Sequence, residues 1–493
     1  MSNSRDVHQT KLPADPLELF VDPSARRSIT RSIYRQLRQA IASGRVAAGD
    51  RLPPTRELAA QLGVSRHTIT TVYDQLVGEG YLSGRAGGGT FVNAASPRDL
   101  TGRRSPSTPV SSDPTTTRPP SVAPRFDLRP GAPDHRLFPT VEWRRCMLTA
   151  LQRPPAGYGD PGGLPELREA IAHWISRSRG LDAPAEHIVV TSGAQQAIDL
   201  ALRLLVRPGD IVAVEEPGYA PVMQLCRAVG ADVRPVPVDA EGLVVDRLPK
   251  GTRLVYTTPA HQFPTGVVMS LPRRLALLDH AERHDVIVIE DDYDSEYRHV
   301  ARPLEPLQRL DRHERVIYVD TFSKTMSPAL RLGFAMLPRP LVQSFLELRE
   351  LTDWQPAEPV QTAMVRFIVD GHLSRHLRRT RKVYSERHRL VTQFLAAAVE
   401  QRWLAGFTPT SAGLHITAAL GLGTDEDALR GAAEEAGVAI GGFAECWLTP
   451  DPPPGLVIGF GSIADDQLGD ALDTLGAVLQ ARTRRGRVVQ RAQ

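Results

Sequence analysis

The sequence of 493 residues predicts two folded parts, a small and mainly helical module followed by a larger α/β body. Three observations predict this division. Apolar residues recur at helical spacing between Ile29 and Glu79, short β-branched runs alternate with helical segments from Ile188 onward, and residues 94–124 separate the two parts. The separating stretch is rich in Ser, Pro, Thr and Arg, so it predicts a flexible linker. The predicted domains are therefore residues 26–93, the linker 94–124 and the body 125–480.

The small module contains three predicted helices. Ile29–Ile41 is amphipathic, Thr55–Leu62 predicts a second short helix, and Ser65 is a suitable N-cap for a third helix that ends near Glu79. Gly63 allows a tight turn between the second and third helices. One face of the third helix is apolar and is formed by Ile69, Val72, Tyr73 and Leu76.

A predicted hairpin of Tyr81–Ser83 and Thr90–Val92 follows, which completes a winged helix-turn-helix, an arrangement that binds DNA. The charge agrees with this function, because residues 26–93 contain ten Arg and four acids, a formal charge of +6 against +3 for the whole chain. We expect Arg66 to read guanine and Arg85 to follow the backbone or the minor groove. The candidate DNA-binding residues are Thr55, Arg56, Ser65, Arg66, His67, Thr70 and Arg85.

Gly49–Val92 closely resembles the winged helix-turn-helix of GntR-family bacterial transcription factors, over the whole module. One departure is His67, where that family usually has Asn, and it concerns a contact rather than the fold. From the helical pattern alone, a packing module that binds no DNA is the alternative.

Short runs of β-branched residues in the body predict buried strands that alternate with helices, such as Gln195–Leu205 and Arg273–Arg283. Apolar strands without alternation indicate a mostly parallel sheet covered on both faces. Ligands then gather at the carboxyl ends of the strands. The predicted strands are Ile188–Val190, Ile211–Val214, Leu254–Tyr256, Val286–Ile289 and Val316–Val319.

Polar residues follow three of these strands and suit pyridoxal phosphate. The turn after Val190 opens a helix and suits a phosphate, an acidic run follows Ile289, and Lys324 follows Val319. The chain contains only four Lys against 55 Arg, so a Lys in a structured motif indicates a need for a primary amine. A primary amine forms an imine with the cofactor aldehyde and Arg does not, while a carboxylate holds the pyridine nitrogen and an aromatic ring stacks on the cofactor.

The body resembles a fold-type I aminotransferase with a smaller C-terminal α/β subdomain. Joined to a GntR-type module, it resembles the MocR/GabR subfamily of regulators. The resemblance implies that Lys324 forms the imine, Asp291 holds the pyridine nitrogen, Tyr293 lies near the ring hydroxyl and Tyr219 stacks on the ring. It places the phosphate at Gly193, Ala194, Gln195, Thr321, Ser323 and Arg331, and it implies that Tyr158 reaches the phosphate of a partner subunit in a homodimer.

Two departures from aminotransferases concern activity. Phe263 stands where these enzymes usually have Asn, and Gly455–Phe460 lacks the Arg that grips a substrate carboxylate. We therefore expect no efficient transamination, although a slow half-reaction with pyridoxal phosphate is compatible with the residues. No metal site is expected.

The expected function is a regulator that binds double-stranded operator DNA and senses a small amine, an amino acid or pyridoxal phosphate itself. The alternatives are a genuine aminotransferase with a DNA-binding appendage, and a structural or non-DNA interaction protein. The chain has no run of 18 apolar residues, and its three Cys form no disulfide framework or metal motif. A cytoplasmic location associated with the nucleoid, away from membranes, is expected.

Overall fold

The computed structural model describes residues 19, 29–85, 88–93, 124–152, 157–299 and 305–492, with only the backbone of Arg85 and of residues 483–492. The chain divides into two compact units, residues 1–119 and 120–493. Apart from Pro124, the predicted linker lies outside the described residues, as do residues 26–28. The predicted domain limits therefore stay predictions, and each unit is described by itself.

The smaller unit packs three helices, α1 (Ile29–Ala42), α2 (Thr55–Leu62) and α3 (Arg66–Gly78). These bounds agree with the predicted helices to within one residue at each end. Gly63 ends α2 in the left-handed conformation at φ 64°, a conformation that glycine adopts without strain. The apolar faces of the helices meet in one core that includes Ile33, Leu37, Leu58, Ile69, Val72 and Leu76.

The predicted hairpin is confirmed, with strands β1 (Leu82–Arg85) and β2 (Gly89–Val92) paired antiparallel. The register pairs Leu82 with Val92, so both apolar side chains point into the core of the helices. The hairpin is thus anchored to the helices at its base.

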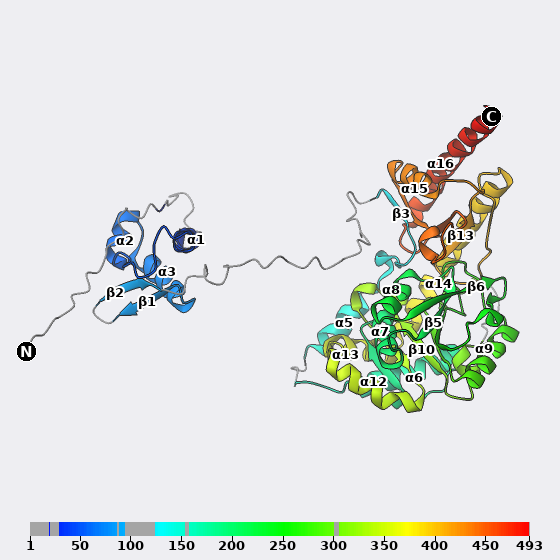
Figure 1. Ribbon diagram of the computed structural model, residues 1–493, viewed down its shortest axis with the longest axis horizontal. Helices are drawn as coiled ribbons and strands as arrows, with labels where there is room; N and C mark the ends of the chain where they lie inside the picture. The colour runs from blue at the N-terminus through cyan, green and yellow to red at the C-terminus, as the bar shows by residue number, and fades with distance from the viewer. Residues whose placement is uncertain are drawn as a thin grey trace, which may run out of the picture. The chain divides into compact units, whose positions relative to one another are not determined.

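The larger unit is built on a sheet of eight strands in the order β4-β11-β10-β9-β8-β5-β6-β7. Its strands β5, β6 and β10 are labelled in Figure 1. Strands β4, β10, β9, β8, β5 and β6 run parallel, and β11 and β7 run antiparallel to their neighbours. The strands are β4 (Ile188–Thr191), β5 (Ile211–Glu216), β6 (Asp232–Asp239), β7 (Gly242–Leu243), β8 (Thr252–Thr257), β9 (Ile287–Asp292), β10 (Val316–Thr321) and β11 (Gly333–Met336). The five predicted strands are therefore confirmed, and β6, β7 and β11 were not predicted.

Helices cover both faces of this sheet, as expected for strands without polar alternation. One face packs on α7 (Ala194–Leu205), α8 (Ala220–Ala228) and α12 (Arg339–Thr352). The other packs on α6 (Pro165–Arg179), α9 (Leu271–His284) and α13 (Glu358–Val369). In β9, Ile289 joins the first core and Val288 the second, which is the alternation of a strand buried on both faces.

A second sheet of five strands forms the smaller subdomain, in the order β12-β13-β15-β14-β3. Its strands are β3 (Phe126–Leu128), β12 (Gly406–Phe407), β13 (His415–Ala419), β14 (Val438–Gly442) and β15 (Gly455–Gly459). Strand β3 is therefore contributed from the start of the unit and the other four from its end. The long helix α14 (His372–Glu400) and the helices α15 (Glu426–Glu435) and α16 (Asp465–Ala492) accompany this sheet.

The remaining described helix of at least eight residues is α5 (Thr140–Ala150), which packs against α13. Short helices are α10 (Leu307–Leu310) and α11 (Phe322–Thr325). Within the described residues, none of the helices combines the length and the apolar character that a membrane crossing needs.

Candidate functional site

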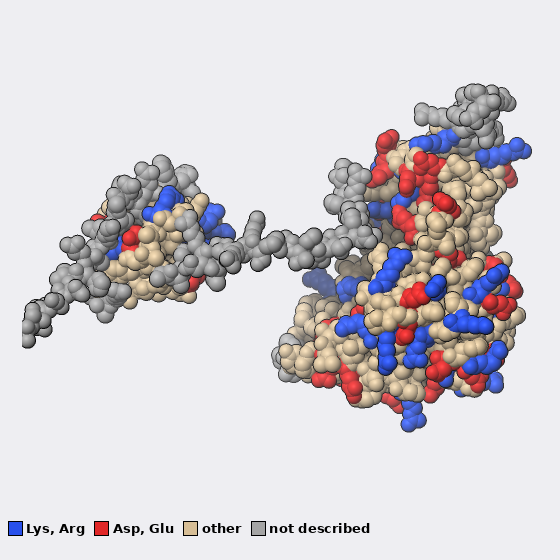
Figure 2. Space-filling view, viewed as in Figure 1, with Lys and Arg blue, Asp and Glu red and all other residues tan. Residues whose placement is uncertain are grey.

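Three candidate DNA contacts are exposed to solvent, two of them at the start of α3. Arg66 and His67 are exposed on its first turn, and Arg56 is exposed on α2. Within the described residues, no hydrogen bond or ion pair engages these three side chains. They are therefore free to reach a nucleic acid. On the face of the larger unit seen in Figure 2, by contrast, basic and acidic side chains are interspersed.

The hydroxyl groups of Ser65 and Thr70 are already engaged at the start of α3. Ser65 caps α3, because its Oγ accepts the backbone N–H of Thr68 at 3.1 Å. The hydroxyl of Thr70 donates to the carbonyl of Arg66 at 3.0 Å. Thr55 is half-buried at the first residue of α2, and the side chain of Arg85 lies outside the described residues. The DNA contacts predicted for these four residues therefore stay predictions.

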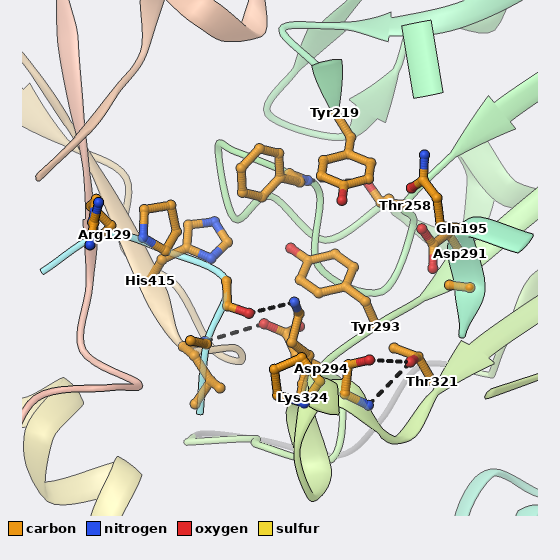
Figure 3. Close-up of a pocket in the computed structure, with 18 of the residues that line it drawn as sticks. Arg129, Gln195, Tyr219, Thr258, Asp291, Tyr293, Asp294, Thr321, Lys324 and His415 are labelled. Atoms are coloured by element: carbon orange, nitrogen blue, oxygen red, sulfur yellow. Dashed lines mark hydrogen bonds between the residues drawn. The ribbon is translucent and has the colours of Figure 1, made fainter. Parts of the chain in front are cut away.

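The larger unit contains a cavity of about 560 Å³ at the carboxyl ends of its parallel strands. Most of the predicted cofactor residues line it, although they come from separate parts of the chain (Figure 3). This is the edge where an open α/β sheet places its ligands. The lining residues among those predicted are Ala194, Gln195, Tyr219, Asp291, Tyr293, Thr321, Ser323, Lys324 and Arg331.

Lys324 lies in the short helix α11, directly after β10, and its side chain enters the cavity. Its Nζ donates to the carbonyl of Gly131 at 2.6 Å. Burial lowers the pKa of this amine, although the carboxylates of Asp294 and Asp291 oppose the shift. A larger share of Lys324 is therefore neutral at a given pH, which is the form that attacks a carbonyl carbon.

Asp291 lies at the end of β9 and faces the same cavity. Its Oδ2 accepts the hydroxyl of Tyr256 at 2.7 Å. Its Oδ1 is buried and has no partner among the described residues. Burial raises the pKa of Asp291 to about 7, and the hydrogen bond from Tyr256 limits the increase. A buried carboxylate oxygen without a donor fits the N–H of a protonated pyridine.

Hydroxyl groups, a guanidinium and a helix N-terminus meet at another edge of the cavity. The Oγ1 of Thr321 donates to the Oγ of Ser323 at 2.8 Å. The Nη2 of Arg331 donates to the carbonyl of Ser192 at 2.6 Å. Gly193 precedes α7 at φ 90°, and a Cβ there would lie 3.3 Å from the Arg331 guanidinium. These donors fit a phosphate. Gly193 does not line the cavity, but it lies next to Arg331 at the N-terminus of α7.

Aromatic rings form one wall of the cavity. Tyr219 lies between β5 and α8, and Phe263 contacts it edge to face, with ring centroids 5.6 Å apart. Burial raises the pKa of Tyr219 to about 12. Tyr293 also lines the cavity, and its hydroxyl donates to the carbonyl of His261 at 2.9 Å. Phe263 therefore adds an apolar ring at the position where the sequence departs from aminotransferases.

Two histidines lie beside these rings, and neither was singled out from the sequence, although Pro259–Gly266, which contains His261, resembles the loop below the cofactor in aminotransferases. His261 and His415 are both buried, and the Nδ1 of His261 lies 3.0 Å from the Oδ1 of Asp294. Burial lowers the pKa of His415 to about 3, so this ring stays neutral at neutral pH. His415 belongs to β13 of the smaller subdomain. Its contribution to the cavity depends on how the subdomain packs, and no local motif marks it.

Asp292 shows how strand alternation separates two neighbouring acids. Asp291 faces the cavity, whereas Asp292 turns to the other face of β9 and lies 3.3 Å from the Nε of the buried Arg179. The Nη2 of Arg179 also pairs with Glu296 at 2.8 Å. Asp292 therefore belongs to a buried ion-pair network that supports the strand ends rather than to the cavity.

Two predictions concern residues that the cavity of this chain does not include. Tyr158 is 79% exposed and stacks on Trp354, with ring centroids 4.3 Å apart. Its predicted contact with a partner subunit stays a prediction. Strand β15 is buried along its length and brings no charged side chain to the cavity, in agreement with the missing carboxylate-binding Arg.

Comparison with known families and proteins supports both parts of the chain. Residues 29–92 match the family of bacterial regulatory proteins described as the gntR family, and residues 128–450 match aminotransferase class I and II. A kynurenine aminotransferase from Pyrococcus horikoshii has a similar fold, with a TM-score of 0.66 and 28% identity over 73% of this chain and 92% of that chain.

Regulators are similar over nearly the whole chain. The probable rhizopine catabolism regulatory protein MocR of Rhizobium meliloti is 34% identical over 94% of this chain and 96% of its own. The pyridoxine biosynthesis regulator PdxR of Corynebacterium glutamicum is 33% identical over 92% and 96%. A DNA-binding module and an aminotransferase-like body thus occur together in these relatives, and the chain belongs to the MocR/GabR subfamily of GntR-family transcription regulators.

Proposed function

We propose that this regulator binds pyridoxal phosphate covalently through Lys324 and uses the occupied cavity to sense a small amine, an amino acid or the cofactor itself. The observation that carries the proposal is the placement of Lys324 and of the partnerless Asp291 Oδ1 in one cavity. Bound there, the cofactor would supply an aldehyde that reacts reversibly with primary amines and a ring that withdraws electrons.

The described residues fit each part of this group. Asp291 Oδ1 would accept the ring N–H, Tyr219 would stack on the ring, and Tyr293 would lie near the ring hydroxyl. The hydroxyls of Thr321 and Ser323, the guanidinium of Arg331 and the N-terminus of α7 would hold the phosphate. Each role matches the chemistry of the side chain at that place in the cavity.

Lys324 also offers a physical link from the cavity to the segment after the linker. Bound pyridoxal phosphate would engage Nζ of Lys324. A lysine that an effector amine released would have the carbonyl of Gly131 within reach, since Nζ donates to it at 2.6 Å in this structure. Gly131 lies three residues after the end of β3, in the first described segment of the larger unit. The presence or absence of this hydrogen bond would give two states with different energies, which an effector could select.

DNA binding in this proposal uses the start of α3. Arg66, His67 and Arg56 are exposed and unengaged within the described residues, so Arg66 can read guanine and the others can contact bases or phosphates. Two copies in a homodimer would present two such helices to a two-part operator. The dimer is a proposal that rests on the implied role of Tyr158.

The test uses the full-length protein and operator DNA selected by it from random duplexes. Incubation with pyridoxal phosphate should produce a visible absorbance band that borohydride reduces, and Lys324→Ala should lack the band. Operator affinity is then titrated with the cofactor alone and with added amines. A change with the cofactor alone identifies it as the effector, a change only with an amine identifies the amine, and no change in either case contradicts the sensing role.

A genuine aminotransferase is the second candidate, and the aminotransferase-like cavity is the observation in its favour. Phe263 and the absence of a charged side chain on β15 weaken this candidate. Steady turnover of an amino acid with a keto acid acceptor would support it. A single half-reaction without turnover would agree with the sensing role.

A further inference from the structure

From the cavity residues we infer that Arg129 binds an anionic group of the effector, so that the effector is an amine that also carries a carboxylate or a similar anion. The inference rests on the proposed sensing function and names the ligand class of the same site. Arg129 follows β3, whereas aminotransferases carry their carboxylate-binding Arg in the region that matches β15 of this chain.

The first step is the distribution of charge in the cavity. Among the described residues that line it, the cationic side chains are Lys324, Arg331 and Arg129. Lys324 is assigned to the cofactor aldehyde and Arg331 to its phosphate. In Figure 3, Arg129 and Asp291 are drawn on opposite sides of Lys324. Arg129 is therefore the cation available to a ligand that extends away from the cofactor.

The second step is the position of the segment that carries Arg129. This segment crosses the end of β15 so closely that a Cβ on Gly459 would lie 2.4 Å from the carbonyl oxygen of Arg129. A Cβ on Gly461 would lie 2.3 Å from the carbonyl oxygen of Ala132. Glycines thus allow residues 129–132 to lie where β15 ends. Arg129 thus lines the cavity from this neighbouring segment, while β15 itself offers no cation.

The third step is the orientation of the guanidinium. Asp127 holds Arg129 with two parallel hydrogen bonds, from Nε to Oδ1 at 2.8 Å and from Nη2 to Oδ2 at 2.7 Å. Both side chains are partly exposed, at 47% and 37%. The pair is therefore accessible and exchangeable, because an exposed ion pair contributes little free energy. A carboxylate on the effector offers the same two-point geometry as Asp127 and would compete with it.

The walls around this position limit the rest of the ligand. Phe263, Leu414 and Pro130 contribute apolar surface, and His415 is neutral. An apolar linker between the amine and the anion suits such walls better than further charges. The expected effector is thus an amine and an anion joined by a short carbon chain.

The experiment uses two substitutions with opposite expected effects in the full-length protein loaded with pyridoxal phosphate. Arg129→Gln removes the cation, and Asp127→Asn removes the charge that competes for it. The probes are the ω-amino acids from β-alanine to aminocaproate, each paired with the alkylamine that lacks its carboxylate. Dissociation constants are read from the change in cofactor absorbance, which needs no turnover.

Wild-type protein should bind the best amino acid about 10- to 100-fold more tightly than its paired amine, as expected for a charge-assisted contact. Arg129→Gln should remove this preference, and Asp127→Asn should increase it. Matched controls are Arg234→Gln and Asp232→Asn, because this pair has the same spacing, with Nε to Oδ2 at 2.9 Å, and lies outside the cavity. The controls should keep the wild-type preference.

The inference is wrong if wild-type protein shows no preference for the carboxylated probes, or if Arg129→Gln keeps it. Equal shifts in the Arg234 and Arg129 variants would also overturn it, since they would indicate a general charge effect. Cofactor loading and operator affinity are measured on the same samples. If wild-type protein does not bind the cofactor, or does not bind the operator, the proposed function is wrong. If it binds both and shows no preference for carboxylated probes, only the inference about Arg129 is wrong.

Discussion

The hydroxyl of Tyr256 donates to Oδ2 of Asp291 at 2.7 Å and leaves Oδ1 of the same carboxylate buried without a partner among the described residues. An unmatched buried oxygen costs about 1 to 3 kcal/mol. Tyr256 orients the carboxylate and leaves its other oxygen able to accept a hydrogen bond. Burial raises the pKa of this carboxyl group to about 7, and the hydrogen bond from Tyr256 limits the increase.

Asp291→Asn should weaken pyridoxal phosphate binding about 10- to 100-fold, because the charge-assisted hydrogen bond to the ring nitrogen is lost. Absorbance titration of the purified protein measures the dissociation constant. Tyr256→Phe should cause a smaller loss, since it only releases the orientation of the carboxylate. The exposed Asp246 provides the control, and Asp246→Asn should bind like wild type. If Asp291→Asn binds pyridoxal phosphate as tightly as wild type, Asp291 does not bind the ring nitrogen.

Lys324→Arg should abolish the borohydride-reducible absorbance band although it keeps the positive charge, because Arg has no primary amine that forms an imine. Mass spectrometry after reduction should find no added cofactor in this variant. Lys382→Arg makes the same change at an exposed position of α14 and should keep the modification. A modified Lys324→Arg protein would show that another amine holds the cofactor.

Arg66→Ala should weaken operator binding by about 1 to 3 kcal/mol and relax the preference at one base pair, since a bidentate guanine contact is removed. Fluorescence anisotropy on operator variants at a fixed salt concentration measures both effects. Arg35→Ala, on the exposed face of α1, should change affinity less and leave base preference intact. Unchanged base preference in Arg66→Ala would contradict the assigned role of the start of α3.

Asp134→Ala should destabilise the larger unit by about 3 to 5 kcal/mol, because the Nη2 of Arg387 pairs with Asp134 at 2.7 Å and both side chains are 2% exposed. Burial disfavours the ionised carboxyl, but hydrogen bonds from Arg136 and Arg387 lower its pKa below the usual value. Denaturant unfolding measures the loss at neutral pH. Asp232→Ala, in an exposed pair, should lose less than about 1 kcal/mol.

The same carboxyl predicts a pH dependence of stability. Its pKa is lower in the folded state than in the unfolded state, so its contribution is complete above the unfolded pKa of about 4 and disappears as pH falls through the folded pKa. Wild-type stability should decrease in that acid range more steeply than that of Asp134→Ala. If the stability of the two proteins changes with pH in parallel, Asp134 does not contribute to the pH dependence of stability.

Much of the small unit could be predicted because its determinants are local. Helix α2 occupies Thr55–Leu62 as expected, since Gly63 and the spacing of its apolar residues lie within a few positions of each other. Ser65 caps α3 for the same reason. Strand β11 was missed because Gly333–Met336 is short and begins with a glycine. Its antiparallel place between β4 and β10 is a long-range property.

In the candidate site, too, the residues marked by local sequence could be predicted, and those that depend on long-range packing could not. Asp291 and Lys324 could be located because Asp291 lies at the end of one mainly apolar strand and Lys324 just beyond another. Parallel strands end at one edge of a sheet. His415 and Arg129 could not, because they reach the cavity from β13 and from the segment after β3, which are far apart in the chain. The separation of Asp291 from Asp292 depends on which face of β9 meets the cavity.

The sequence by itself determined the two kinds of domain, the helix α3 and the presence of Lys324 and Asp291 near strand ends. It could do so because helix caps, apolar periodicity and residue type act over short distances along the chain. Only the tertiary structure decided which oxygen of Asp291 stays open, where Tyr158 lies, and that Arg129 faces the cavity beside a strand without charge. Those properties depend on packing between distant segments, where burial and close approach of glycines set the contacts.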